Sequence, residues 1–375
     1  MTDEHRLRQQ LITHLIDGGS LRTEPWKKAV EATPRHQFLR GGFFRPVEGS
    51  TPTAWAPVRE GDPEWLASCY EDKSLVTQIA GTIVPDDIRG EILRLPTSSS
   101  TLPSLVVSML EDLEVEDGMR VLEIGTGTGY STALLSHRLG ADAVTSIEYD
   151  QDVHTRASAA LGQVDQYPDL VLGDGLDGYE ENGPYDRIIA TCGVHTVPQA
   201  WIDQVKPGGQ ILTTVGGWLG ASELARLTVA DDKTASGHFL GGQISFMLAR
   251  PHLPPALGLL PDLSDGPERT THVGADVLHD WTTRFVAQTA ASRTQHLTMS
   301  TDGRTEHVLL DVDAGSWAVL YEQDGGWTVR QGGDTALWDD IETHLDRWKA
   351  IGSPSLENFT ITVTPEGQEV RPRDS

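Results

Sequence analysis

A strand that leads into a glycine-rich turn constrains the fold of this chain most strongly. Residues 121–124 form a short apolar run that ends in three alternating glycines, at Gly125, Gly127 and Gly129. A helical pattern follows over Ser131 to Leu139. Because glycine has no Cβ, it lets the backbone turn tightly and approach a ligand closely. The segment therefore predicts a strand–turn–helix unit whose turn contacts a bound small molecule.

The spacing of these glycines narrows the choice of ligand. The turn has the pattern Gly-x-Gly-x-Gly, with Glu123 two residues before the first glycine and Thr126 inside the turn. A dinucleotide site has Gly-x-Gly-x-x-Gly, which places a pyrophosphate on a helix N-terminus. A methionine-derived nucleoside has no pyrophosphate and does not need that spacing. We therefore expect Glu123 and Thr126 to join the glycines in a site for such a cofactor.

Strands and helices alternate from about residue 74 to residue 252. Predicted strands cover 121–124, 144–147, 170–172, 187–190 and 210–215, and predicted helices cover 105–113, 131–139 and 153–161. This alternation predicts an α/β fold with a parallel sheet that is covered on both faces. Ligands of such sheets bind outside the carboxyl ends of the strands.

Two acidic residues follow successive strands of this predicted sheet. Glu148 ends the second strand, where a carboxylate can accept hydrogen bonds from both hydroxyls of a ribose. Asp174 follows the third strand, and its side chain with the N–H of Gly175 can hold an adenine edge. Each signal alone fits a bland alternative: another nucleotide fold for Glu148, and an ordinary turn for Gly173-Asp174-Gly175. Their order on successive strand ends favours a nucleoside site.

With these elements the chain resembles a class I, Rossmann-like methyltransferase, and more narrowly a protein-L-isoaspartate O-methyltransferase. The resemblance rests on stretches outside the glycine turn as well, and it runs from about Pro34 to Arg250. These stretches are Pro34-Arg35-His36-Gln37-Phe38, Cys69-Tyr70-Glu71-Asp72-Lys73-Ser74-Leu75, Gly183-Pro184-Tyr185-Asp186-Arg187-Ile188-Ile189, Val197-Pro198 and Lys206-Pro207-Gly208-Gly209. The resemblance implies S-adenosyl-L-methionine as the cofactor and a carboxylate of a peptide or protein, on an Asp or isoAsp residue, as the methyl acceptor.

The signature of that family, Gln-Thr-Ile-Ser-x-Pro, is altered here. The aligned residues are Ser98, Ser99, Ser100, Thr101, Leu102 and Pro103. The resemblance places Ser98 to Ser100 at the cofactor and Thr101 in the role of the active-site serine. Threonine keeps the hydroxyl donor, but its methyl group narrows the site. A bland alternative is that the Ser/Thr run caps a helix that begins at Pro103.

The altered signature is similar to that of a divergent branch associated with ribosomally made, modified peptides such as lanthipeptides and graspetides. Members of that branch esterify an ordinary Asp in a modified peptide, and attack by the next backbone nitrogen gives a succinimide and often isoaspartate. They also carry a C-terminal extension. The resemblance therefore implies peptide biosynthesis as the function, with classical repair of isoaspartyl damage as the alternative.

The pattern divides the chain into four parts. Residues 1–73 form a helical and loop region, with helices over 7–16 and 24–32 and a loop over 41–62; residues 74–252 form the methyltransferase core. Residues 253–269 form a proline-rich linker, and residues 270–375 form a small α+β extension. Five tryptophans of the extension, Trp281, Trp317, Trp327, Trp338 and Trp348, could contact a peptide or simply fill a core.

Charge and composition exclude several classes of function. The formal net charge of −26 disfavours a nucleic-acid substrate, because such binding depends on Lys and Arg. An amino methyltransferase of nucleic acids would also need Asp/Asn-Pro-Pro-Tyr/Phe where Thr191-Cys192-Gly193-Val194 stands. No apolar run is long enough to predict a membrane span, and the acidic start of the chain does not resemble a secretory signal. Two distant cysteines, Cys69 and Cys192, predict neither a disulfide framework nor a metal site and fit a reducing cytoplasm.

His195 follows the fourth predicted strand and invites a catalytic role. A carboxylate is already ionised near neutral pH, so its methylation needs no general base. We therefore interpret His195 as a loop residue. A non-catalytic binding protein stays open as a further alternative, although the retained glycines, Glu148 and Asp174 argue against it.

Overall fold

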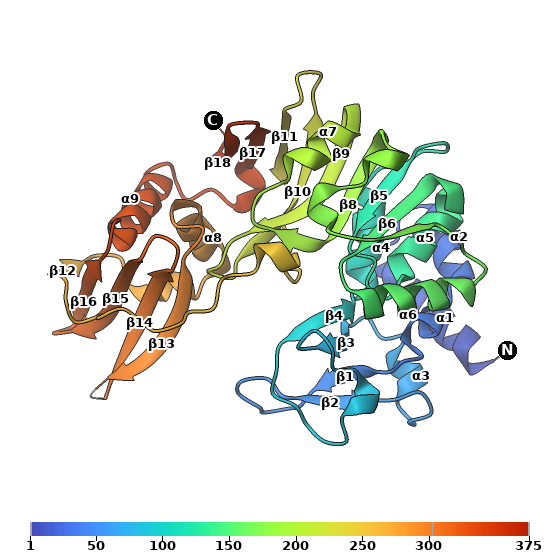
Figure 1. Ribbon diagram of the computed structural model, residues 1–375, viewed down its shortest axis with the longest axis horizontal. Coiled ribbons are helices and arrows are strands. Elements are labelled where there is room, and N and C mark those ends of the chain that lie inside the picture. Colours follow the sequence, from blue (N-terminus) through green and yellow to red (C-terminus); the bar gives the residue numbers. More distant parts are fainter. Residues whose placement is uncertain (1, 302, 374–375) are drawn as a thin grey trace. The chain divides into compact units, whose positions relative to one another are not determined.

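The computed structural model describes residues 2–301 and 303–373 and divides into two compact units. The first unit contains residues 1–191 and 200–212, and the second contains residues 192–199 and 213–375. The predicted methyltransferase core ends at residue 252, whereas the strands after residue 212 belong to the same unit as the C-terminal region. Figure 1 shows the chain coloured along its sequence.

The first unit contains the predicted parallel strands. They are β5 (Val121–Ile124), β6 (Val144–Glu148), β7 (Asp169–Leu172) and β8 (Tyr185–Val194), followed by β9 (Val205–Gly216). Their order is β9-β8-β5-β6-β7, and β5 pairs in parallel with both β6 and β8. All four residues of β5 are buried, as expected for a central strand between two neighbours. The predicted α/β class is therefore confirmed.

Helices α4 (Pro103–Asp112), α5 (Tyr130–Leu139) and α6 (Gln151–Gly162) follow the predicted positions within a few residues. Helices α5 and α6 pack on strand β6 (Figure 1). The Asp150 carboxylate caps α6 by accepting hydrogen bonds from the N–H groups of Asp152 and Val153. This cap fixes where α6 begins, directly after the acidic end of β6.

The predicted loop over 41–62 is wrong in part, because it contains two strands. Strands β1 (Phe43–Pro46) and β2 (Trp55–Val58) join β3 (Leu75–Ile79) and β4 (Pro96–Ser100) in an antiparallel sheet of order β2-β1-β3-β4. Phe44, Val76 and Ile79 form its buried core. Glycine and proline at the ends of these short strands conceal the alternation that would have predicted them.

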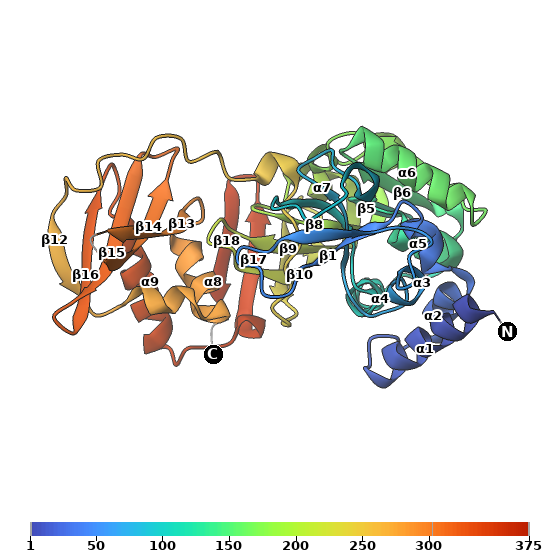
Figure 2. The ribbon, with the colours of Figure 1, turned by 90° about the horizontal axis from the view of Figure 1, so that it is seen from below.

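The N-terminal helices are close to the prediction. They are α1 (Asp3–Asp17) and α2 (Glu24–Ala32), which lie side by side in both ribbon views (Figures 1 and 2). Two further short helices are α3 (Trp65–Ser68) and α7 (Gln199–Gln204). The described residues contain no helix that is long and apolar enough to span a membrane.

The second unit contains two groups of strands. One has the order β18-β17-β11-β10-β9 and includes β10 (Ser222–Val229), β11 (Ala235–Phe239), β17 (Phe359–Thr364) and β18 (Gly367–Pro372). The other has the order β12-β16-β15-β14-β13, with β12 (Glu268–Thr271), β13 (Gln295–Thr301), β14 (Arg304–Asp311), β15 (Ser316–Gln323) and β16 (Gly326–Gly332). Helices α8 (Trp281–Ala290) and α9 (Leu337–Ala350) complete the unit.

The predicted C-terminal extension is not a simple appendage. Its strand β17 pairs antiparallel with β11, which belongs to the predicted core. The predicted proline-rich linker contains no helix or strand from 253 to 267, and its Leu257 and Leu263 pack against buried side chains of β14 and β15. Three tryptophans of the predicted extension, Trp317, Trp338 and Trp348, are buried, which favours a core role for them.

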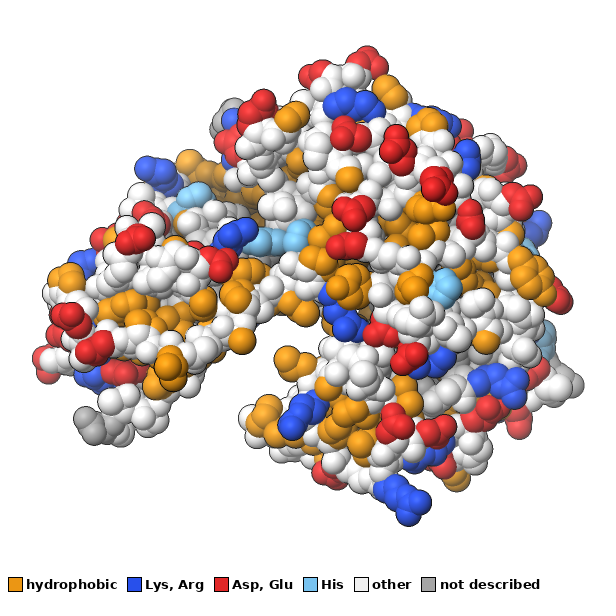
Figure 3. Space-filling model, viewed as in Figure 1, with side chains coloured by type: hydrophobic (Ala, Val, Ile, Leu, Met, Phe, Trp, Pro, Cys, Tyr) orange, Lys and Arg blue, Asp and Glu red, His pale blue; other side chains and the backbone are white. Residues whose placement is uncertain are grey.

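Acidic side chains are spread over the face of the molecule shown in Figure 3, with no single large patch. The carboxylates on this face lie apart from one another, and each contributes to the net charge of −26. The described residues on this face form no basic stripe that could bind a phosphate backbone.

Three histidines of the second unit form a cluster. His296 Nε2 and His307 Nδ1 are 3.2 Å apart, their rings are stacked, and the ring of His279 lies 6.1 Å from that of His307. Burial lowers the pKa of His296 to about 4, and His307, His279 and Arg284 add to the effect. Burial also lowers the pKa of His307, whereas the negative charge of Glu322 raises it.

We expect this cluster to make the free energy of unfolding decrease as the pH falls. Neutral histidines in the fold contribute stability above their unfolded pKa of about 6.5, and this stability is lost as the pH falls toward the lower folded values. The urea midpoint should therefore drop between about pH 7 and pH 5. His296→Gln should flatten this dependence, whereas His137→Gln, at an exposed position on α5, should not. Equal slopes in the parent and His296→Gln would contradict the expectation.

Candidate active site

The glycine turn has the backbone conformation that the sequence predicts. Gly125, Gly127 and Gly129 have φ angles of 92°, 55° and 88°, which side-chain-bearing residues rarely adopt. The N–H of Gly125 donates to the carbonyl of Ile147 at 2.9 Å, and the Thr191 hydroxyl donates to the carbonyl of Gly125. Neighbouring strands β6 and β8 thus hold the turn in place above β5.

Glu123 supports the turn from behind. It is fully buried, and its carboxylate accepts hydrogen bonds from the hydroxyls of Thr132 and Ser146. The hydroxyls of Thr126 and Ser146 lie 2.7 Å apart, so Thr126 joins the same network. Burial raises the pKa of Glu123 although these hydroxyls stabilise its charged form. The structure thus places both side chains beneath the turn, and their contact with a cofactor stays a prediction.

Glu148 lies beside the turn, as expected for a ribose ligand. One carboxylate oxygen accepts from the N–H of Gly127 at 2.9 Å, and the other accepts from the N–H of Asp150 at 3.0 Å. Burial raises its pKa, and these two backbone bonds counteract that effect. Each carboxylate oxygen has a second lone pair, so Glu148 can still accept from two hydroxyls. The half-buried carboxylate is oriented before any ligand binds.

Asp174 and Gly175 form the turn that follows β7. The Asp174 carboxylate accepts from the N–H of Leu176 at 3.0 Å, which is an ordinary turn contact. A Cβ on Gly175 would lie 2.5 Å from Ile124 Cγ2, so only glycine lets this turn pack on β5. Trp201 Nε1 donates to the Gly175 carbonyl at 2.7 Å. The turn is therefore fixed next to the glycine-rich turn, and Asp174 stays half-buried at its start.

The altered signature runs from the end of β4 to the start of α4 and brings Thr101 to the same region. Ser98 and Ser100 are buried, and Ser99 is half-buried. The Ser99 carbonyl would be 3.5 Å from a Cβ on Gly127, so the end of β4 lies against the glycine turn. Among the residues that the structure describes, none accepts from or donates to the half-buried Thr101 hydroxyl.

Thr101 does not cap helix α4. The N–H of Leu102 donates to the Ser74 hydroxyl at 3.0 Å, and the N–H of Ser104 donates to the Asp72 carboxylate at 2.8 Å. These two side chains, from the stretch that joins α3 to β3, satisfy the start of the helix. The helix-cap alternative for Thr101 is therefore not supported, and its hydroxyl is left for another partner.

Arg35 organises this end of the site, a role that the sequence did not reveal. Its fully buried guanidinium donates to the backbone carbonyls of Cys69, Glu71, Lys73, Ser100 and Thr101, and to the Ser100 hydroxyl. Burial lowers the pKa of Arg35 because desolvation opposes its charge, and the nearby Tyr130, Cys69 and Asp72 offset only part of that effect. A buried charge is tolerated only with many hydrogen bonds, which these carbonyls supply. Arg35 thus joins the Asp72 stretch to Thr101.

A second missed contact joins β3 to the start of α6. The fully buried Gln78 donates through Nε2 to the Asp150 carboxylate at 3.2 Å and accepts from the Thr97 hydroxyl at 2.9 Å. Asp150 is also the cap of α6, directly after Tyr149 and Glu148. The sequence signal was the glutamine on a mostly apolar strand, since buried polar side chains require partners.

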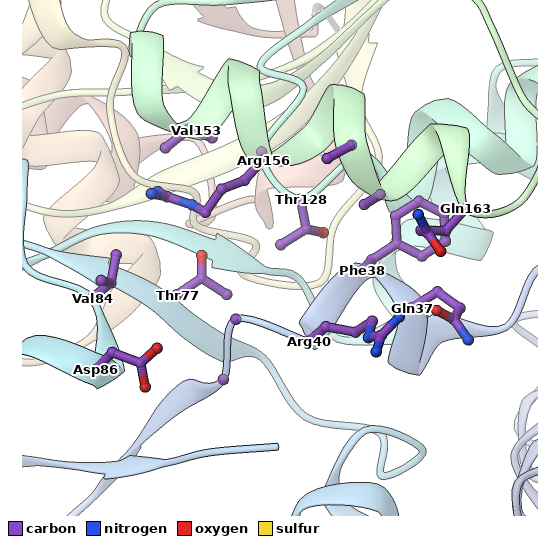
Figure 4. Close-up of a pocket in the computed structure, with 15 residues that line it drawn as sticks. Gln37, Phe38, Arg40, Thr77, Val84, Asp86, Thr128, Val153, Arg156 and Gln163 are labelled. Carbon is purple, nitrogen blue, oxygen red and sulfur yellow. The ribbon is translucent and has the colours of Figure 1, made fainter. Parts of the chain in front are cut away.

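A surface pocket of about 400 Å³ lies beside the glycine turn (Figure 4). Gly127 and Thr128 form one part of its lining, and helix α6 contributes Val153, Arg156, Ala159 and Ala160. Segments from the N-terminal region form the rest, including Phe38 and Thr77. The sequence did not predict this pocket, because its walls come from four segments far apart in the chain.

His195 belongs to the second unit and has structural partners there. Its N–H donates to His252 Nδ1 at 3.1 Å, and its ring lies 5.7 Å from the ring of Trp218. Burial lowers its pKa. The described residues contain no group of three or more His, Cys, Asp or Glu that could hold a metal ion. Neither Cys69 nor Cys192 forms a disulfide in the part of the chain that the structure describes.

The site can hold a nucleoside with an amino-acid tail. Glycines with positive φ leave room for close approach of a ligand, an oriented carboxylate follows β6, and an acidic turn follows β7. These features fit S-adenosylmethionine by the chemistry of their donors and acceptors. When bound, it supplies a methyl group on a positively charged sulfur.

Comparison with known proteins agrees with this geometry. The family model for protein-L-isoaspartate(D-aspartate) O-methyltransferase matches residues 84–240. A protein-L-isoaspartate O-methyltransferase of Cytophaga hutchinsonii is 30% identical over 227 residues, which are 60% of this chain and 83% of the relative. One of Thermotoga maritima is 34% identical over 163 residues, 41% of this chain and 51% of the relative. A solved structure titled protein-L-isoaspartate O-methyltransferase shares the fold, with a TM-score of 0.56 and 24% identity over 98% of this chain and 100% of that chain.

Arg35→Lys should destabilise the site although it keeps the charge. An ammonium group is compact and cannot reach all the carbonyls that the planar guanidinium bridges. Buried carbonyls that lose their donor cost roughly 1–3 kcal/mol each, so we expect a loss of stability on the order of 3 kcal/mol. Urea unfolding would measure this. Arg6→Lys, which changes an exposed pair with Asp3, should stay within about 0.5 kcal/mol of the parent. A similarly small effect at Arg35 would contradict its organising role.

Proposed function

Because this chain belongs to the protein-L-isoaspartate O-methyltransferase family, we propose that it esterifies the free carboxylate of isoaspartyl residues in peptides or proteins. The family makes it an S-adenosylmethionine-dependent carboxyl O-methyltransferase. The observation that carries the proposal for the substrate is the unpartnered hydroxyl of Thr101, which Arg35 and β4 hold beside the glycine turn.

The cofactor contacts in this proposal come from three strand ends. The glycine turn after β5 would receive the amino-acid tail, Glu148 after β6 the ribose hydroxyls, and Asp174 with Gly175 after β7 the adenine edge. Ser98 to Ser100 would line the same space from β4. Glu123 and Thr126 would act indirectly by holding the turn, as their buried hydrogen bonds suggest.

The chain's own contribution to the reaction is orientation. An aspartyl or isoaspartyl carboxylate is ionised near neutral pH and is itself the nucleophile, so no residue needs to remove a proton. Thr101 would donate a hydrogen bond to one carboxylate oxygen and leave the other free to accept the methyl group. Arg35 is a positioning residue, because it touches Thr101 only through the backbone.

A second candidate is esterification of an ordinary Asp in a modified ribosomal peptide, followed by succinimide or isoaspartate formation. The residues that favour it are Ser98, where the family has glutamine, and Thr101, whose methyl group narrows the site. The C-terminal extension does not favour it, because the solved protein-L-isoaspartate O-methyltransferase fold matches 98% of this chain. We therefore place isoaspartyl methylation first.

The partners in this proposal are peptides and proteins, with no nucleic acid and no membrane. Nucleic acid is disfavoured by the net charge of −26. Two cysteines that form no disulfide among the described residues fit a reducing compartment, and we propose the cytoplasm.

Thr101→Ala should slow methyl transfer by roughly ten- to a hundredfold with little change in cofactor affinity, because it removes a donor to a charged group. Thr101→Ser keeps the donor and should retain much of the activity. Mass spectrometry of the methyl ester and of its water-loss product would measure both, on an isoaspartyl peptide, the matching Asp peptide and a cyclised peptide.

The same assay separates the two candidate functions. Preference of the parent enzyme for the isoaspartyl peptide supports the first, and preference for Asp in the cyclised peptide supports the second. Full activity of Thr101→Ala on each of them would show that the hydroxyl takes no part in the reaction.

A further inference from the structure

The pocket beside the glycine turn contains a cation without a partner. Arg156 extends from α6 into this pocket, where Figure 4 shows its guanidinium on the side of Val153, Thr77 and Val84. Within the described part of the chain, Arg156 has neither a hydrogen-bond partner nor an ion-pair partner. Its guanidinium is exposed and available to a ligand.

The other charged groups of the pocket are already paired. Arg40 Nε lies 3.2 Å from the Glu60 carboxylate, and the Asp86 carboxylate lies 3.3 Å from Arg59 Nε. Among the charged side chains that line the pocket, Arg156 is therefore the one without a partner in the described part of the chain. In a chain with 55 acidic and 29 basic residues, such a charge is locally unusual. It favours a carboxylate ligand, which the surface elsewhere repels.

The remaining walls fit a short aliphatic stem. Phe38, Val84, Val153 and Ala160 provide apolar surface, and Gln163 adds an amide at the edge. A glutamate side chain has this composition, with methylene groups that pack on apolar walls and a carboxylate that pairs with a guanidinium. The pocket volume of about 400 Å³ exceeds what one such side chain fills, so adjoining peptide residues also fit.

The pocket lies next to the proposed reaction site and shares only the glycine turn with the proposed cofactor contacts. Its lining includes Gly127 and Thr128 of the glycine turn, and does not include Glu148, Asp174 or Thr101. The Ser99 carbonyl, two residues before Thr101 at the end of β4, lies against Gly127. A peptide whose carboxylate binds Thr101 would therefore reach the pocket, and Arg156, by passing the contact between Ser99 and Gly127.

We propose that this pocket binds an acidic side chain of the peptide substrate, a few residues from the methylated carboxylate, and that Arg156 makes the enzyme prefer such peptides. This inference rests on the proposed function, because it assumes a peptide substrate. It assigns Arg156 a role in substrate specificity, separate from cofactor binding and from methyl transfer itself.

Peptide binding tests the inference without depending on turnover. Fluorescence anisotropy would compare labelled isoaspartyl peptides that carry glutamate or glutamine at each of the three positions on either side of the isoaspartate, with S-adenosylhomocysteine present. For at least one position, the full-length enzyme should bind the glutamate peptide about five- to tenfold more tightly. Arg156→Gln should remove this preference. Arg45→Gln, which removes the same charge at an exposed position outside the pocket, should keep it.

Three results would overturn the inference. One is equal binding of glutamate and glutamine peptides by the parent enzyme at every position. Another is a preference that survives in Arg156→Gln, and the third is weaker binding of S-adenosylhomocysteine in that variant, which would assign the pocket to the cofactor. Methyl transfer to the same peptides is measured separately. Binding with the expected preference but no methylation would count against the proposed function and leave the acidic-peptide site supported.

Discussion

The buried guanidinium of Arg35 is the contact on which the geometry of the site depends. It joins three carbonyls of the stretch between α3 and β3 to the carbonyls of Ser100 and Thr101 at the end of β4. Leu75 pairs with Ser100 where β3 meets β4, and the guanidinium adds donors to carbonyls on both sides of that pair. The same stretch provides Asp72 and Ser74, which satisfy the start of α4. One side chain therefore fixes both the position of Thr101 and the beginning of the next helix.

A second buried hydrogen-bond network fixes the position of the glycine turn. Glu123, Thr126, Thr132 and Ser146 share hydrogen bonds beneath the turn, and Glu148 binds the N–H of Gly127 at its edge. A turn with three positive φ angles gains little from side-chain packing, so such contacts from neighbouring strands must hold it. Orientation before binding matters here because the proposed reaction asks for alignment and no proton transfer.

The core of the fold and the position of the site could be predicted from the sequence because both depend on local patterns. Strand β5 and helix α2 match their predicted bounds, since a buried apolar run and a helix that stops before Pro34 are local signals. The N-terminal sheet escaped prediction because β1 and β2 are four residues long and lie among glycines and prolines. Strand β17 escaped because its partner β11 is distant in the chain. The motif placed Glu123 next to the glycine turn. Its burial beneath the turn could not be predicted, because it depends on Thr132 of α5 and Ser146 of β6.

The central claim is that a nucleoside cofactor lies across the ends of β5, β6 and β7, with its reactive side toward Thr101. A crystal structure of the complex with S-adenosylhomocysteine tests it most directly. The account predicts ribose hydroxyls within hydrogen-bond distance of the Glu148 carboxylate, the adenine edge at Asp174 and Gly175, and the sulfur on the side of Thr101. Glu148→Ala should then weaken binding about tenfold or more, as expected for lost charge-assisted hydrogen bonds. A ribose that does not contact Glu148, or a sulfur that faces away from Thr101, would contradict the account.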